Sequence, residues 1–227
     1  MTETFDQPDA LLATLVCIET CTHFQQRGFS MGTRLNHLLH GSYLSTWEAF
    51  ATEMQGTWSA PSFGHNARIE IPHAHGPIVL ERDVTMIMTG KVMIPVVSTI
   101  FSAPRPTNPA HRFSVSRANF ATSVAEWFGR LDIHVDDPVF DEAFVLKGET
   151  PDFVRSLFRD APLRDRYRAD FEGSLALKDD TAFFADPTPG IDPLELAVSG
   201  IIEDGARLRR VYELFAATVT RLDELGG

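Results

Sequence analysis

Cysteine is scarce in this sequence: two occur among 227 residues, Cys17 and Cys21. A secreted domain held together by disulfides would carry more of them. Helical geometry rarely suits a disulfide between positions four residues apart, and His23 would point away from both thiols. We therefore expect two reduced thiols, without a metal or redox site, in a cytoplasmic protein.

Long apolar runs are also missing. The longest, Ala10 to Ile18 and Val92 to Phe101, are interrupted by polar residues or by proline. Both are far shorter than the ~20 residues that span a bilayer. The first residues, Met1 to Asp6, lack the basic start of a signal peptide. These absences predict a soluble, cytoplasmic protein without a membrane span.

Positive charge is in deficit. The chain carries 31 acidic and 20 basic residues, for a formal net charge of -11. Such a surface repels phosphate backbones and anionic lipids, which argues against nucleic acid and membrane partners. The densest basic run is interleaved with aspartates, so we interpret it as an ion-paired helical surface, with an anion- or partner-binding patch as the alternative. Its members are Arg155, Arg159, Arg164, Arg166 and Arg168.

Motifs for phosphate and dinucleotide binding are absent as well. The sequence has no Walker loop and no Gly-x-Gly-x-x-Gly pattern. We assign no catalytic residue and no cofactor on the sequence.

Apolar periodicity, in contrast, is plentiful. Hydrophobic residues make up 44% of the chain and charged residues 22%, an ordinary globular composition. Helical patterns fill the first part of the chain, including the stretch from Thr33 to Gln55, and strand patterns begin after Gly56. We therefore expect a helical N-terminal region, residues 1–56, followed by an α+β domain, residues 57–227.

The second region is predicted to be mainly antiparallel, because short strand patterns alternate with turn residues. About seven strands, one of them over Thr181–Ala185, are interleaved with helices such as Asn119–Phe128. A long helix, capped by Asp204, closes the C-terminus. Its inner stripe consists of Leu208, Val211, Phe215, Val219 and Leu222. The predicted fold class is α+β: an antiparallel sheet with inserted helices, a closing C-terminal helix and an N-terminal helical extension.

One acidic stretch, Asp136 to Gly148, combines a proline turn with two phenylalanines four residues apart. We expect Asp136 or Asp137 to cap a helical turn, after which Phe140 and Phe144 share a face toward the core. This favours a structural junction between helix and strand over a reaction centre. The alternative is a cation site, although the spacing differs from that of an EF-hand loop. Its ligands would be Asp136, Asp137, Asp141 and Glu142.

The same stretch carries a family resemblance. Its residues Asp137-Pro138-Val139-Phe140-Asp141-Glu142-Ala143-Phe144 resemble the Asp-Pro-x-Phe-Asp-x-x-Phe pattern of a bacterial domain-of-unknown-function family. In the order of elements the resemblance covers roughly residues 60 to 225, and only this motif is specific. The family offers no catalytic residues, so the resemblance implies an arrangement of elements and no activity.

His73 and His75 are the candidate metal ligands. An i,i+2 pair on a strand points to one side, and imidazole is a common zinc ligand. The residues available to complete a set are His65, Glu70, Asp83 and His111. The competing interpretation is simple solvent exposure, because the pair lies in a His-Ala-His-Gly-Pro turn.

Two functions follow as hypotheses. The first is a non-catalytic interaction module that binds a protein partner or itself. Self-association through the N-terminal helices, giving a homodimer, is one form of it, because a broad apolar stripe suits an interface. The second is a metal-dependent, hydrolase-like enzyme that uses His73, His75 and nearby carboxylates.

Overall fold

The structure is a computed structural model, and it describes residues 43–226 apart from 63–64, 90–91, 119–131 and 180–188. Several expectations from the sequence fall on the remaining residues. They are the thiols of Cys17 and Cys21, the helices that precede residue 43, the helix over 119–128 and the strand over 181–185.

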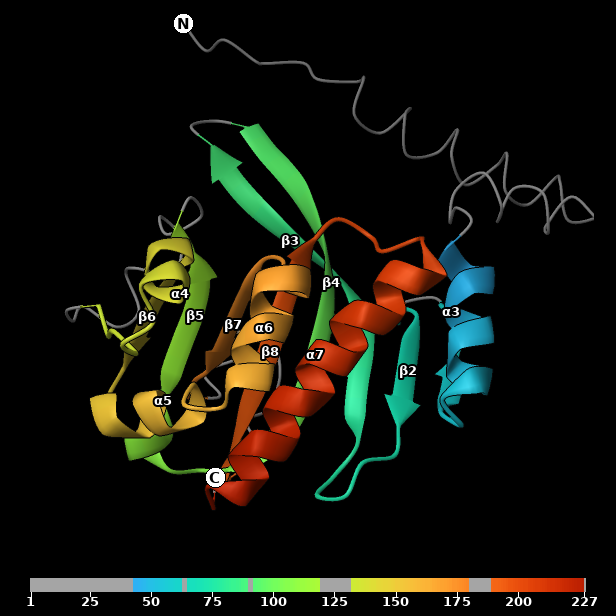
Figure 1. The fold of residues 1–227 in the computed structure, drawn as a ribbon. Coiled ribbons are helices and arrows are strands. Elements are labelled where there is room, and N and C mark those ends of the chain that lie inside the picture. The colour runs from blue at the N-terminus through green and yellow to red at the C-terminus, as the bar shows by residue number, and fades with distance from the viewer. Residues whose placement is uncertain (1–42, 63–64, 90–91, 119–131, 180–188, 227) are drawn as a thin grey trace, which may run out of the picture. The chain divides into compact units, whose positions relative to one another are not determined.

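Within the described residues, eight strands form one antiparallel sheet in the order β1-β2-β3-β4-β8-β7-β5-β6 (Figure 1). The predicted α+β class is confirmed, with eight strands in place of about seven. The strands are β1 (Thr57–Ser59), β2 (Arg68–Ile71), β3 (Ile78–Thr89), β4 (Val92–Pro106), β5 (Phe113–Arg117), β6 (Phe144–Gly148), β7 (Ser174–Leu177) and β8 (Ile191–Ser199). The α-helices are α3 (Tyr43–Glu53), α4 (Pro138–Ala143), α5 (Pro151–Leu157), α6 (Ala161–Asp170) and α7 (Gly205–Glu224), and a 3-10 turn spans Pro109–His111.

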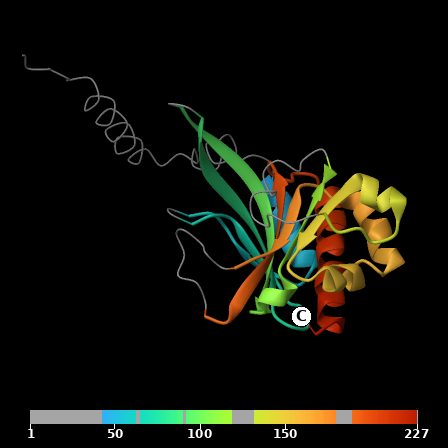
Figure 2. The ribbon, with the colours of Figure 1, turned by 90° about the vertical axis from the view of Figure 1, so that its left-hand side faces the viewer.

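The helices lie on one face of the sheet, so the domain has two layers (Figure 2). Because only one face of the sheet is covered, residues of strand β8 alternate between partly exposed and buried from Ile191 to Val198. Alternation of this kind is typical of an antiparallel sheet with one covered face. The hydrophobic core therefore lies between the sheet and the helices.

The closing helix α7 behaves as its sequence predicts. Asp204 caps it, because its carboxylate accepts a hydrogen bond from the N–H of Arg207 at 2.7 Å. The predicted inner stripe is buried in full, and each of these side chains contributes roughly 1.5–3 kcal/mol of transfer free energy. The ring of Phe215 lies 6.0 Å from that of Phe101 on β4, which fixes α7 across the middle of the sheet.

Helix α3 packs against the sheet domain. Trp47 is fully buried, and its indole Nε1 donates to the carbonyl oxygen of Ile202 at 2.9 Å. Phe50 meets Tyr212 of α7 edge to face, with 5.6 Å between ring centroids. Contacts group residues 42–227 into one compact unit, so this helix belongs with the strands that follow it.

Strand β4 extends farther than the sequence indicates. The prolines after Ala103 suggest a loop, yet β4 continues to Pro106 beside β8. The carbonyl of Val97 points toward β8, where it accepts a hydrogen bond from the N–H of Gly200. Backbone groups alternate along a strand, so the N–H and C=O groups of the even-numbered residues of β4 point toward β3. The pairing of β3 with β4 ends at Ser102, so Pro104 and Pro106 cost the sheet no hydrogen bond to β3.

No described helix is both long enough and apolar enough to cross a membrane.

Candidate functional site

The Asp136 to Gly148 stretch builds a helix start and a strand start next to each other. Asp136 has φ +59°, a left-handed conformation that aspartate tolerates. Asp137 then caps α4, because its carboxylate accepts from the N–H of Phe140 at 3.2 Å. Pro138 follows in the first turn, where its missing N–H costs nothing.

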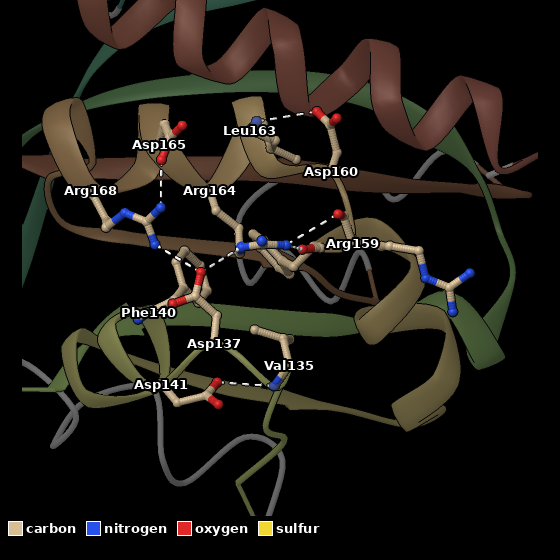
Figure 3. A network of polar contacts seen from close by, with 11 residues as sticks. Val135, Asp137, Phe140, Asp141, Arg159, Asp160, Leu163, Arg164, Asp165 and Arg168 are labelled. Carbon is tan, nitrogen blue, oxygen red and sulfur yellow. Dashed lines mark hydrogen bonds and ion pairs between the residues drawn. The ribbon is translucent and has the colours of Figure 1, made fainter.

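The carboxylate of Asp137 is also the centre of an ion-pair network (Figure 3). Its Oδ2 accepts from Nε of Arg164 at 2.9 Å and from a terminal nitrogen of Arg168 at 3.0 Å. Together with the Phe140 N–H, these donors hold the pKa of Asp137 below its ordinary value of 3.8, with Arg168 the largest influence. The network ties α4 to α6, which lies 27 to 31 residues later in the chain.

Behind this network lies an aromatic cluster. Phe140 and Phe144 are buried, and their ring centroids are 4.6 Å apart. Phe158, Tyr167 and Phe171 complete the cluster, with centroid separations of 5.0 to 5.6 Å between neighbours. The predicted packing of the two motif phenylalanines is therefore confirmed.

Two of the four carboxylates of this stretch, those of Asp137 and Asp141, are engaged within the protein. Asp141 accepts from the backbone N–H of Val135 at 3.0 Å, and Asp137 is held by two arginines. Among the described residues, no group of three or more His, Cys, Asp and Glu side chains is placed to hold a metal ion. The stretch therefore acts as a junction between elements.

The basic run divides between two environments. Arg164 and Arg168 turn toward Asp137, whereas Arg155 pairs with Asp152 and Arg166 with Glu213 at the surface. Sequence reasoning missed the pairing with Asp137. The signal was the four-residue spacing of Arg164 and Arg168, which places both on one face of α6.

His73 and His75 line a shallow depression of about 330 Å³ beside the last turn of α7. The Nε2 of His73 lies 3.4 Å from the hydroxyl of Thr220, and His75 is exposed. Two carboxylates line the same depression, and both are paired: Asp223 with Arg105 at 2.5 Å, and Glu224 with Arg221 at 2.7 Å. The histidine pair remains a candidate with two imidazoles and no uncommitted carboxylate beside it.

Three of the four other proposed ligands, Glu70, Asp83 and His111, have separate partners. Glu70 is paired with Arg68, and the carboxylate of Asp83 accepts from Thr85. His111 stacks on Phe153 with 4.1 Å between ring centroids, and burial lowers its pKa from the ordinary 6.5. These contacts give each residue a local role in the fold.

One short pattern lies outside the described residues. Residues 28–32 read Gly-Phe-Ser-Met-Gly, which matches the Gly-x-Ser-x-Gly spacing of a nucleophile elbow. The motif needs a strand-to-helix turn around the serine before it carries chemistry. Because residues 28–32 lie outside the described residues, the pattern supports no assignment of a nucleophile.

Strands β3 and β4 form a hairpin that extends beyond its neighbours. Strand β2 pairs with β3 over Ile78–Glu81, and β8 pairs with β4 from Ser98 onward. Between these limits the described residues of β3 and β4 form strand pairs only with each other. We call this part, Arg82–Val97, the arm. It projects at the end of the domain opposite the C-terminus (Figure 1), and Arg82 at its base interacts with Tyr43 of α3.

The arm is unusually apolar for a projecting element. Nine of its sixteen residues are hydrophobic, and they include three of the six methionines of the chain. Val84, Met86 and Ile94 are 38%, 51% and 46% exposed. In the part of the chain that the structure describes, Val139 is the only other large hydrophobic residue exposed to this degree.

One face of the arm continues the core face of the sheet. Leu80 pairs with Phe101, and both are buried beneath α7. Alternation of side chains places the next pairs in this series on the same face: first Arg82 with Thr99, then Val84 with Val97 and Met86 with Pro95. Val84 and Met86 are exposed there. The surface that buries the core thus runs on past the helices that cover it.

The two edges of the arm differ. The N–H of Arg82 points toward β2, where it meets the carbonyl of Ala67 at 3.4 Å, so Val84 and Met86 present N–H and C=O to the open edge of β3. On β4 the carbonyl of Val97 points to the side on which β8 lies. Pro95, two residues earlier, therefore faces the same side, at a position that β8 does not reach. Proline has no backbone N–H to donate, so a strand added along this edge of β4 would lack one hydrogen bond there.

Comparison with known proteins adds no relative. No family model, no curated protein and no solved structure matches the chain.

Proposed function

We propose that this protein is a non-catalytic interaction module that binds a protein partner through the arm. The observation that carries the proposal is the exposure of Val84 and Met86 on one face of a hairpin that projects beyond its own sheet, with Ile94 exposed on the opposite face. Exposed apolar surface gathered in one place usually marks an interaction site. Its methionines favour a protein partner, because their flexible, polarisable side chains adapt to varied surfaces.

The polar clusters support the same proposal by being committed to the fold. The Asp137 network ties α4 to α6, and the carboxylates beside the histidine pair are held by arginines. Groups that already hold one another in ion pairs are poorly placed to serve as general acids or bases. The arm, in contrast, has apolar side chains and backbone groups still to be satisfied.

Site-specific photo-crosslinking tests the proposal. A photoreactive amino acid replaces Met86 in one sample and Val139 in a matched control, since both side chains are exposed and apolar. After irradiation in extract of the source cells, we expect a discrete protein adduct from position 86 that excess wild-type protein suppresses and excess Met86→Lys protein does not. The proposal fails if position 86 gives no adduct, or if both positions give the same adducts.

The alternative function is a metal-dependent, hydrolase-like enzyme. Its support is that His73 and His75 line one depression together with Asp223 and Glu224. Metal analysis after dialysis against zinc separates the two functions. One equivalent of zinc, lost in the His73→Ala/His75→Ala variant, would favour the enzyme, and a metal content equal to that of the variant would count against it.

Two further expectations from the sequence are part of this proposal, and a third stands apart from it. We take the protein to be cytoplasmic, on its charge and cysteine content, and related to the bacterial family whose motif it resembles at Asp137 to Phe144. Self-association through the N-terminal helices lies outside the described residues and stays a separate hypothesis.

A further inference from the structure

We infer that the partner of the arm is a second copy of this chain, and that two copies join edge to edge through β3 as a two-fold dimer. The inference rests on the proposed function and names its partner. Three features of the arm support it: the edge that is open, the distribution of charge, and the face that the pairing would create.

The open edge sets the number of copies. Strand β3 offers the N–H and C=O groups of Val84 and Met86, whereas Pro95 blunts the equivalent edge of β4. An unblocked strand edge is a template for pairing with another chain. Because the arm of each copy has one edge that can pair, antiparallel pairing of two arms uses that edge of both copies and closes at two copies.

Charge selects the arm over the rest of the surface. Arg82 and Lys91 against Asp83 give the arm a formal charge of +1, so the rest of the chain carries -12. Two such bodies repel each other wherever they meet face to face. Antiparallel arms hold them apart by about the length of Arg82–Thr89, roughly 27 Å at ~3.4 Å per residue. That distance is about three Debye lengths at physiological salt, so repulsion between the bodies is largely screened.

The pairing also joins the apolar faces. A two-fold axis perpendicular to the sheet keeps the same face of both arms on the same side. In the register that gives this separation, Met86 of one copy lies opposite Met86 of the other and Val84 lies diagonal to it, and cross-strand neighbours of this kind stabilise a sheet. A foreign strand would have to supply a matching apolar series of its own.

The test is the mass of the full chain in solution, by sedimentation equilibrium and light scattering. We expect wild type to have twice the chain mass of 25.3 kDa. Met86→Lys and Met86→Glu each place like charges across the two-fold axis and should be monomers. An equimolar mixture of the two should recover the dimer, which shows that neither variant has lost its fold. Val139→Lys, the matched control at an exposed apolar residue on α4, should stay dimeric.

Each result has a stated consequence. A monomeric wild type at ~100 µM, a hundredfold above a micromolar dissociation constant, overturns the inference. So does a dimer that persists in both Met86 variants, which would point to the N-terminal helices. In either case, a discrete crosslinked adduct between position 86 and a different protein would still support the proposed function. The absence of any such adduct removes both.

Discussion

Replacing Phe140 by alanine should destabilise the domain strongly, because this ring is the centre of the aromatic cluster behind the Asp137 network. The side chain is fully buried, and its ring lies 4.6 Å from Phe144 and 5.3 Å from Phe158. A buried phenylalanine contributes up to about 3 kcal/mol of transfer free energy. The cavity left behind adds to this loss, so we expect a total of about 3–5 kcal/mol.

Val139 provides the matched control. It is the preceding residue of the same short helix, yet it is 65% exposed. Val139→Ala should therefore change the free energy of unfolding by no more than about 0.5 kcal/mol. Phe140→Leu, which keeps part of the apolar volume, should fall between the two.

Urea unfolding followed by near-ultraviolet circular dichroism measures the difference, with the slope checked for equality between variants. A loss of about 4 kcal/mol corresponds to a fall in Tm of roughly 8–16 °C for a domain of this size. The reasoning is refuted if Phe140→Ala unfolds within about 1 kcal/mol of wild type. Equal effects of Phe140→Ala and Val139→Ala would refute it as well.

Three further changes test other parts of the fold. Gly173→Ala should cost more than about 2 kcal/mol, because the residue has φ +88° and an added Cβ would lie 1.9 Å from a carbonyl oxygen of β8; Gly190→Ala, with φ +81° and open space around it, should lower the melting temperature less. The difference in stability between wild type and Asp137→Asn should shrink as the solution becomes acidic. The pKa of Asp137 in the folded protein lies below 3.8, so the stabilisation by its carboxylate is complete above that pH and is lost as pH falls through the folded pKa. Thermal melts of both proteins measure this, and a stability difference that stays constant from pH 6 to pH 2 would contradict the prediction. Thr218→Val should cost about 1–3 kcal/mol by stranding the buried hydroxyl of Tyr167, 3.1 Å away. Tyr167→Phe in the same chain should recover part of that loss in urea titrations.

Local chemistry could be predicted from the sequence where the cause lies within a few residues. The helical stripe and the cap at Asp204 depend on spacings of three and four residues, and both are present in α7. The cap at Asp137 and the ring contact between Phe140 and Phe144 follow from the same local geometry. Thr150 shows the limit: it occupies the cap position of α5, but its side chain makes no capping hydrogen bond.

Contacts between distant segments were decided by the tertiary structure. The sequence presents Arg164 and Arg168 as part of a basic run, and the packing of α4 beside α6 brings both to Asp137. The histidine pair gains carboxylate neighbours only because α7 ends beside it, and those carboxylates are already bound to arginines. Such pairings join residues tens to more than a hundred positions apart, beyond the reach of any local pattern.

The arm shows the same division. By itself the sequence determined an antiparallel α+β domain and the apolar run from Val92 to Phe101 within it, because alternation and composition are properties of neighbouring residues. That these strands run past β2 and β8, with one edge open and the other blunted by Pro95, depends on where their partners end. Strand pairing is a contact between distant segments, so only the tertiary structure could show that this apolar hairpin lies at the surface.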